Sequence, residues 1–171
     1  MKYNKSFGGR EKYFPTKYKK DRTNDCVIRA ISHATGIDYK TVFQDLLDLS
    51  WKTGHLPDEE RCYGEYLKFL GWKKHKPFRK ANNRLLKVGQ IQEHSGTFLV
   101  HTSMHLTCIK DGELYDSWDC RKASAYSYYQ KERNTIATIN CKNCNTPTPI
   151  EDSIDEWCKD CNKLALLEEV A

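Results

Sequence analysis

The chain has 171 residues, of which 39% are hydrophobic and 30% are charged, a composition typical of a globular protein that folds in water. No apolar run approaches the roughly 20 residues that a membrane helix needs, so we expect no membrane partner. Residues 1–10 lack the apolar stretch of a secretory signal, which indicates a cytoplasmic location.

The net charge of +5 is unevenly distributed along the chain. Residues 139–171 contain three lysines and seven acidic residues, whereas residues 1–138 contain 25 basic and 16 acidic residues, so these parts carry −4 and +9. We interpret residues 1–23 as a basic N-terminal arm that forms coil or a short edge segment. Such an arm can contact nucleic acid or an acidic protein, but no periodic basic stripe accompanies it, which favours a solvated arm.

Three helices are predicted in the first half of the chain, because apolar residues recur there at helical spacing. The segments are 26–35, a second that begins near residue 38, and 59–70. Asp25 before the first segment and Gly36 after it are typical start and stop signals.

Strands are predicted in the second half, over 96–100, 105–110, 113–118 and, more weakly, 135–139. Asp111-Gly112 between two of them is a strong signal for a two-residue hairpin turn. Helices followed by antiparallel strands indicate an α+β fold for residues 24–138.

Two C-x-x-C pairs, Cys141 with Cys144 and Cys158 with Cys161, are separated by thirteen residues. Four thiolates complete a tetrahedral shell without an open position, so we predict one structural Zn²⁺ per chain. Residues 139–171 are too few to bury a core, and the metal would supply their folding energy. A redox motif is usually single and opens a helix of a βαβ unit, which this segment lacks. Two disulfides are the other alternative, which a reducing cytosol disfavours.

A second group of residues fits cysteine catalysis. Cys26 opens the first predicted helix, where the dipole and free N–H groups favour a thiolate. The hairpin register places His105, Asp116 and Trp118 on one face, with Asp116 as the diagonal neighbour of His105. Asp116 can then fix the imidazole tautomer, and Trp118 can cover the pair from water.

The same region suggests an oxyanion site. If Asp25 is the N-cap, its carboxylate accepts from the N–H of Val27 or Ile28 and leaves the Cys26 N–H free for an oxyanion. Asn24 is a further candidate donor. The charge of Asp25 opposes a thiolate, so a neighbouring cation or imidazolium is required.

Other residues compete for these assignments. His94 and His101 are rival bases, and Asp119 is a rival orienting acid. The remaining cysteines, Cys62, Cys108 and Cys120, are expected as packing residues.

These residues resemble the papain-like cysteine peptidases, which place Cys at the start of a helix, His at a later strand and Asn-Ser-Trp after it. Even more similar are small papain-fold proteins often encoded by bacteriophages, with an N-D-C-x-x-R-A-I block and a G-H-L-T-x-x-x-D-G-x-x-x-D-x-W-D block. The matching residues within about 20–135 are Asn24, Asp25, Cys26, Arg29, Ala30, Ile31, His105, Leu106, Thr107, Asp111, Gly112, Asp116, Trp118 and Asp119. Met104 replaces the usual glycine, and no glutamine precedes Cys26.

The resemblance implies a papain-like fold with a zinc-ribbon appendage and a cysteine peptidase or amidase activity on a protein or peptide. Cys26 would attack a peptide, isopeptide or related amide bond, with His105 as the base and Asp116 orienting it. Acyl transfer uses the same groups and stays open. A phage protein would act on a host or virion protein in the host cytoplasm. The alternative is a non-enzymatic binding protein that blocks a host protein and docks through the ribbon.

We expect the purified protein to carry about one zinc per chain, measured by elemental analysis without chelators. Cys144→Ser removes one ligand and should release the metal and unfold residues 139–171, while the larger domain stays folded. Asn143→Ser, which spares every ligand, is the control. Protein without zinc or iron would contradict the metal site, and global unfolding of the Cys144 variant would contradict the independence of the two parts.

Overall fold

The computed structural model of the protein describes residues 1–14, 23–131, 138–140, 147–149, 157–158 and 163–164. The chain forms two compact units, Met1–Glu132 and Arg133–Ala171. None of the described helices combines the length and the apolar content needed to cross a bilayer.

The second unit contains two short antiparallel strand pairs. They are β7 (Thr138–Asn140) with β8 (Pro147–Pro149), and β9 (Trp157–Cys158) with β10 (Lys163–Leu164). Among the predicted zinc ligands, Cys158 ends β9, whereas Cys141, Cys144 and Cys161 lie outside the described residues. The zinc ribbon therefore stays a prediction.

The first unit has a mixed α+β fold, as predicted. Its helices are α1 (Cys26–Thr35), α2 (Tyr39–Thr53) and α3 (Glu60–Phe69), with two short 3₁₀ helices, η1 (Arg10–Lys12) and η2 (Val88–Glu93). Its strands are β1 (Lys2–Lys5), β2 (Trp72–His75), β3 (Thr97–His101), β4 (Leu106–Lys110), β5 (Glu113–Asp116) and β6 (Ser127–Lys131). The sequence patterns do not predict β2 or β6.

The six strands form one sheet in the order β1-β5-β4-β3-β6-β2. β1 runs parallel to β5, and all other neighbours are antiparallel. The hairpin of β4 and β5 turns at Asp111 and Gly112, whose φ angles of 52° and 76° are those that a two-residue turn requires. Lys110 pairs with Glu113, which is the predicted register.

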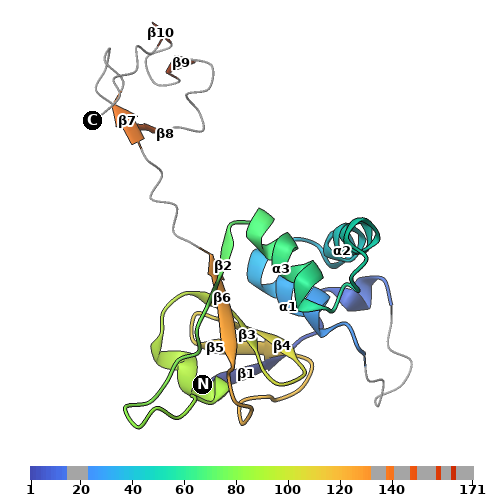
Figure 1. Cartoon of the computed structure of the whole chain (residues 1–171), viewed down its shortest axis with the longest axis vertical. Helices are drawn as coiled ribbons and strands as arrows, with labels where there is room; N and C mark the ends of the chain where they lie inside the picture. The colour runs from blue at the N-terminus through green and yellow to red at the C-terminus, as the bar shows by residue number, and fades with distance from the viewer. Residues whose placement is uncertain (15–22, 132–137, 141–146, 150–156, 159–162, 165–171) are drawn as a thin grey trace. The chain divides into compact units, whose positions relative to one another are not determined.

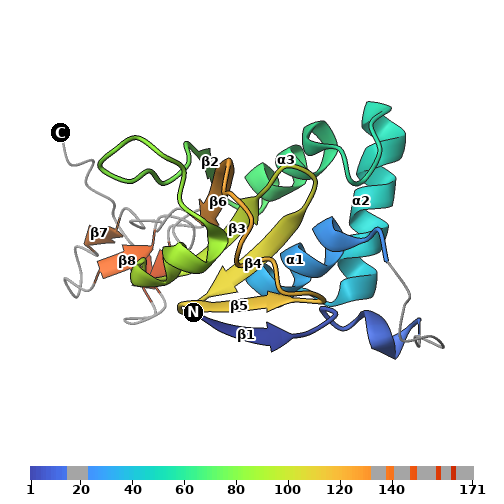
Figure 2. The same cartoon turned by 90° about the horizontal axis from the view of Figure 1, so that it is seen from below.

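The sheet is covered on both faces. The three helices lie on one side of the sheet (Figures 1 and 2). α1 packs on β3, β4 and β5, α3 packs on β2, and α2 packs on α1 and α3. Leu99, Leu106 and Cys108 of the sheet belong to the core on this side. η2 covers the opposite face, where Val88 and Ile91 pack with Phe98, Val100 and Ile109, among others. Alternation along β3 and β4 sends successive side chains into the two cores.

Residues 1–14, within the predicted N-terminal arm, are part of the first unit. β1 lies at the edge of the sheet with Tyr3 opposite Leu114, and Met1 and Tyr3 pack against the core beneath η2. A four-residue strand with lysine at both ends has too few apolar residues for its period to be recognised. At the other end, the unit stops at Glu132 rather than at residue 138.

The segment after β1 approaches α1 closely at Gly8. A Cβ atom at Gly8 would lie 2.8 Å from the carbonyl oxygen and 2.9 Å from the Cα of Arg29, and its φ of 65° is left-handed. Gly36 has a similar φ of 76° but open space around it. At both positions an L-residue would have a strained backbone, and at Gly8 its side chain would also clash with the backbone of Arg29.

We predict that Gly36→Ala lowers the free energy of unfolding by about 1 kcal/mol, because an L-residue is strained at that φ. Gly8→Ala should cost about 2–4 kcal/mol, since the new methyl group also meets backbone atoms. Urea denaturation followed by circular dichroism measures both. Equal losses in the two variants would mean that the contact with Arg29 is not tight.

Candidate functional site

Cys26 is the first residue of α1 and is half-buried against the core on the helical side of the sheet. Asp25 is the N-cap residue, but its side chain makes no capping hydrogen bond, which corrects the prediction that it accepts from Val27 or Ile28. The described residues include no acceptor for the Cys26 N–H, so this donor remains available at the start of the helix.

The Asp25 carboxylate instead lies among cations and a phenol. Its Oδ1 accepts from Arg29 Nε at 2.8 Å, and its Oδ2 accepts from Tyr39 Oη at 2.7 Å and lies 3.0 Å from Arg10 Nε. Burial raises the pKa of Asp25, but hydrogen bonds from Tyr39, Thr23 and Arg29 hold it below its ordinary value. The negative charge beside Cys26 is thus compensated locally, because two guanidinium groups contact it.

His105 sits directly before β4, at the end of the tight turn that joins β3 to β4. The backbone N–H of Thr102 donates to the His105 carbonyl at 2.8 Å, and the Thr102 hydroxyl donates to the same oxygen at 3.1 Å. These two bonds fix the backbone of His105, so its ring is presented from a rigid element.

Asp116, the last residue of β5, is 4% exposed and orients His105. Its Oδ2 lies 2.5 Å from Nε2 of His105, the contact expected from the hairpin register. Asp116 Oδ1 accepts from the Ser117 N–H at 2.6 Å and from Arg29 Nη1 at 3.4 Å. Because Nε2 is occupied by Asp116, Nδ1 is the ring nitrogen left for Cys26.

Cys26 and His105 lie near enough to shift each other's pKa. Burial raises the Cys26 pKa, but hydrogen bonding from His105 and the Leu106 N–H, with the charge of His105, brings the pKa below its ordinary value. Burial lowers the His105 pKa, whereas hydrogen bonding with Asp116, Cys120 and Cys26 raises it to about 11. The two shifts are opposite in direction, and each favours the charged form of its group.

Trp118 lies over the pair as predicted. Its ring centroid is 5.2 Å from that of His105 with an interplanar angle of 49°, and half of the residue is exposed. Met104, on the other side of His105 in sequence, is 92% exposed. The base is thus bordered by apolar side chains that face solvent.

Cys120 is a member of the site that the sequence pattern did not single out. It is 1% exposed, and its Sγ donates to Asp116 Oδ2 at 3.7 Å. The only sequence signal is its spacing of four residues from Asp116, which is weak in an irregular segment. Cys62 and Cys108 are fully buried, as expected of packing residues.

One group of potential metal ligands is present among the described residues. The ligand atoms of His105, Asp116 and Cys120 lie within 4.8 Å of one another. The Asp116 and His105 atoms are already hydrogen-bonded at 2.5 Å, and Arg29 stands beside the carboxylate. These contacts fit an orienting acid and its base better than a cation site.

The rival bases have other surroundings. His94 stacks on Phe78 at 4.1 Å between ring centroids. His101 ends β3, and burial lowers its pKa, with Glu60 raising it and Lys74 lowering it. No carboxylate of the described residues is hydrogen-bonded to the His101 ring.

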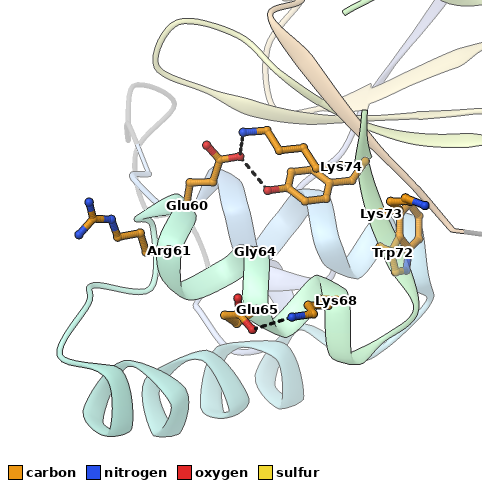
Figure 3. Close-up of a pocket in the computed structure, with 9 residues that line it drawn as sticks. Glu60, Arg61, Gly64, Glu65, Lys68, Trp72, Lys73 and Lys74 are labelled. Carbon is orange, nitrogen blue, oxygen red and sulfur yellow. Dashed lines mark hydrogen bonds and ion pairs between the residues drawn. The ribbon is translucent and has the colours of Figure 1, made fainter. Parts of the chain in front are cut away.

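Glu60 belongs to a hollow of about 530 Å³ between α3 and β2, where Lys74 and Tyr129 bind its carboxylate at 2.5 and 2.7 Å (Figure 3). Gly64 lies on the same side of α3 (Figure 3), and a Cβ there would be 3.2 Å from the Tyr129 hydroxyl. The glycine leaves room for Tyr129 to reach Glu60, so these contacts attach α3 to the sheet.

Two further predictions concern support of the site. Asp119 is bound by Arg121 at 2.7 and 2.8 Å, so it is engaged away from His105. Asn24 is exposed, and its side chain forms no hydrogen bond with the described residues of the site. The structure therefore brings together Cys26, His105, Asp116 and Trp118, but not Asn24.

Comparison with known proteins finds no match to this chain among protein families, curated proteins or solved structures.

The charged pair predicts a specific dependence of stability on pH. Between about pH 7 and 8.5 the folded parent holds one proton on His105, and the unfolded chain holds one on Cys26, whose ordinary pKa is 9.0. Unfolded His105, with an ordinary pKa of 6.5, is neutral there. If the folded Cys26 is a thiolate in this range, the proton counts are equal and this pair makes no contribution to the pH dependence of parent stability.

In Cys26→Ala the folded state keeps the His105 proton, but the unfolded chain has lost its thiol proton. The raised pKa of His105 therefore stabilises the folded state fully below pH 6.5, and this stabilisation decreases as the pH rises. We expect the free energy of unfolding of this variant to fall relative to the parent by up to about 1.4 kcal/mol per pH unit from pH 7 to 8.5. Urea denaturation at several pH values measures it.

His101→Ala is the control, because the lowered pKa of His101 leaves it neutral in both states above pH 7. Its pH dependence should follow the parent. Parallel curves for the parent and Cys26→Ala would show that His105 and Cys26 are not ionised together.

Proposed function

We propose that the first unit is a cysteine hydrolase of the papain-like type, which cleaves a peptide, isopeptide or related amide bond. The observation that carries the proposal is the grouping of Cys26, His105 and Asp116, in which a 2.5 Å bond joins His105 to Asp116 and His105 lowers the pKa of Cys26. A nucleophile, a base and an orienting group in contact are the requirements of cysteine catalysis.

The reaction uses the two ring nitrogens of His105 differently. The Cys26 thiolate attacks the substrate carbonyl carbon, and the proton on Nδ1 passes to the leaving amine. Water then cleaves the thioester as His105 accepts its proton. Asp116 stays ionised and holds Nε2, so the ring keeps the orientation that both proton transfers need.

The start of α1 supplies the oxyanion donor. The Cys26 N–H has no described acceptor, and it points from a helix end whose dipole favours negative charge. Asn24 is exposed and would have to turn toward the substrate to add a second donor. The backbone N–H is therefore the main group in this proposal.

The arrangement of elements supports the proposal. The nucleophile opens a helix packed on the sheet, and the base and acid come from adjacent antiparallel strands. The substrate would be a protein or peptide that reaches the exposed rim of Met104 and Trp118. The zinc ribbon of residues 139–171, if metal-bound, would serve as a docking module in the cytoplasm.

Alkylation of Cys26 by iodoacetamide, followed by peptide mapping, tests the site. At pH 6.5 the parent should label Cys26 far faster than Cys62, because the thiolate is already formed. His105→Ala should slow Cys26 labelling about 10- to 100-fold, as the thiol returns to its ordinary pKa. Asp116→Asn should slow the labelling of Cys26 less, since the amide oxygen can still accept a hydrogen bond from His105.

His101→Ala is the matched control, a histidine at the neighbouring strand end outside the pair, and its labelling rate should equal that of the parent. A second readout is acylation of Cys26 by p-nitrophenyl acetate, detected by mass, and lost in Cys26→Ala. Equal labelling of Cys26 and Cys62 in the parent, unaffected by His105→Ala, would instead favour the non-enzymatic binding protein.

A further inference from the structure

We propose that Arg29 is a positioning residue that keeps the Cys26–His105 pair charged by binding the carboxylates of Asp25 and Asp116 simultaneously. The inference rests on the function proposed above and extends it to a residue that does not touch the reacting atoms. Arg29 lies one turn after Asp25 on α1, with its side chain directed toward the end of β5.

The guanidinium contacts the two carboxylates through different nitrogens. Arg29 Nε is 2.8 Å from Asp25 Oδ1, and Nη1 is 3.4 Å from Asp116 Oδ1. The Arg29 and Asp116 side chains are 4% and 3% exposed, so solvent screens their interaction weakly. Among the described residues, these contacts form an ionic link between the helix of the nucleophile and the strand of the acid.

The charges around the site balance only when Arg29 is included. Cys26, Asp25 and Asp116 contribute three negative charges in the active form, whereas His105, Arg29 and Arg10 contribute three positive ones. Without Arg29 a buried excess of one negative charge remains, which opposes ionisation of the Cys26 thiol.

The groups that face this cluster come from every neighbouring element. They are Arg10 from η1, Asp25, Cys26 and His33 from the α1 region, Tyr39 from α2, His105 and Thr107 from the β4 region, Asp116, Ser117 and Cys120 from the β5 region, and, electrostatically, Tyr3 from β1 and Glu11 from η1. Arg29 and Arg10 are the guanidinium groups among them. Among the described residues, Arg10 contacts Asp25 but not Asp116.

The backbone around Arg29 is enclosed as well. Gly8 fits against the Arg29 Cα and carbonyl with no room for a side chain. The segment that follows β1 therefore covers Arg29, and Arg10, two residues later, binds the far oxygen of Asp25. The N-terminal residues thus contribute to the burial of Arg29, which is 3% exposed.

A purely structural ion bridge and a charge-balancing one have different consequences. A structural bridge affects folding without shifting the pH at which Cys26 ionises. A charge-balancing residue changes that pH, and removal of a cation or of an anion moves it in opposite directions. The pH profile of Cys26 alkylation separates these two cases.

The test uses the full chain and iodoacetamide, and peptide mapping gives the alkylation rate of Cys26. The rate is measured from about pH 4 to about pH 10, the range in which a thiol and an imidazole titrate. Arg29→Met should raise the midpoint of the profile by about one pH unit and lower the rate below the midpoint about tenfold. Asp25→Asn keeps an acceptor for Arg29 but removes a negative charge, so its midpoint should fall. Arg121→Met removes a partly exposed ion pair and should leave the profile unchanged.

The buried thiols of Cys62 and Cys108 report folding in the same samples, because they stay unlabelled only in a folded unit. A folded Arg29→Met protein with an unshifted midpoint, or with a uniform loss of rate, would overturn the inference. If Arg29→Met unfolds, Asp25→Asn decides, and an unchanged midpoint overturns the inference. A parent in which Cys26 labels no faster than it does in His105→Ala removes the proposed function and this inference together, whereas a faster parent with unshifted variants removes the inference alone.

Discussion

The buried carboxylate of Asp116 is the constraint on which the first unit depends. A carboxylate inside a protein needs donors and opposite charge around it, since water cannot solvate it. Asp116 meets this need with His105, Arg29 and the Ser117 N–H, which come from the turn before β4, from α1 and from the segment after β5. Three separate parts of the chain are therefore held together at one end of the sheet, and the candidate site lies where they meet.

The same constraint explains why the N-terminal residues belong to this unit. Arg29 can compensate Asp116 only from a helix that is firmly placed, and its partner Asp25 also requires compensation. Arg10 and Tyr39 supply it from η1 and α2. β1 anchors the preceding segment beside β5, so the residues that complete the charge cluster are positioned by the sheet that carries Asp116.

Side chains around the base divide into those that bind it and those that border it. Asp116 and Cys120 lie on the buried side of His105, whereas Trp118 and Met104 face solvent. Such a division suits a base that must keep its tautomer while it exchanges protons with a bound substrate. His101, on the neighbouring strand end, lies near the Glu60–Lys74 pair and has no comparable acid.

The sequence by itself determined the elements with strong local signals. Helix periods, with Gly36 as the stop of α1, and the Asp111-Gly112 turn set α1, α3 and the β4–β5 hairpin, because backbone conformation there is decided by a few adjacent residues. The hairpin register follows from the turn, and it already implied that Asp116 and not Asp119 would lie beside His105.

Only the tertiary structure decided what the charged and short segments do. β1, β2 and β6 have too few buried residues to show a period, and their place is set by neighbours distant in sequence. Asp25 binds Arg10, Arg29 and Tyr39 instead of capping α1, and Cys120 joins the site, because electrostatic pairing in a buried space depends on distances that no local pattern encodes.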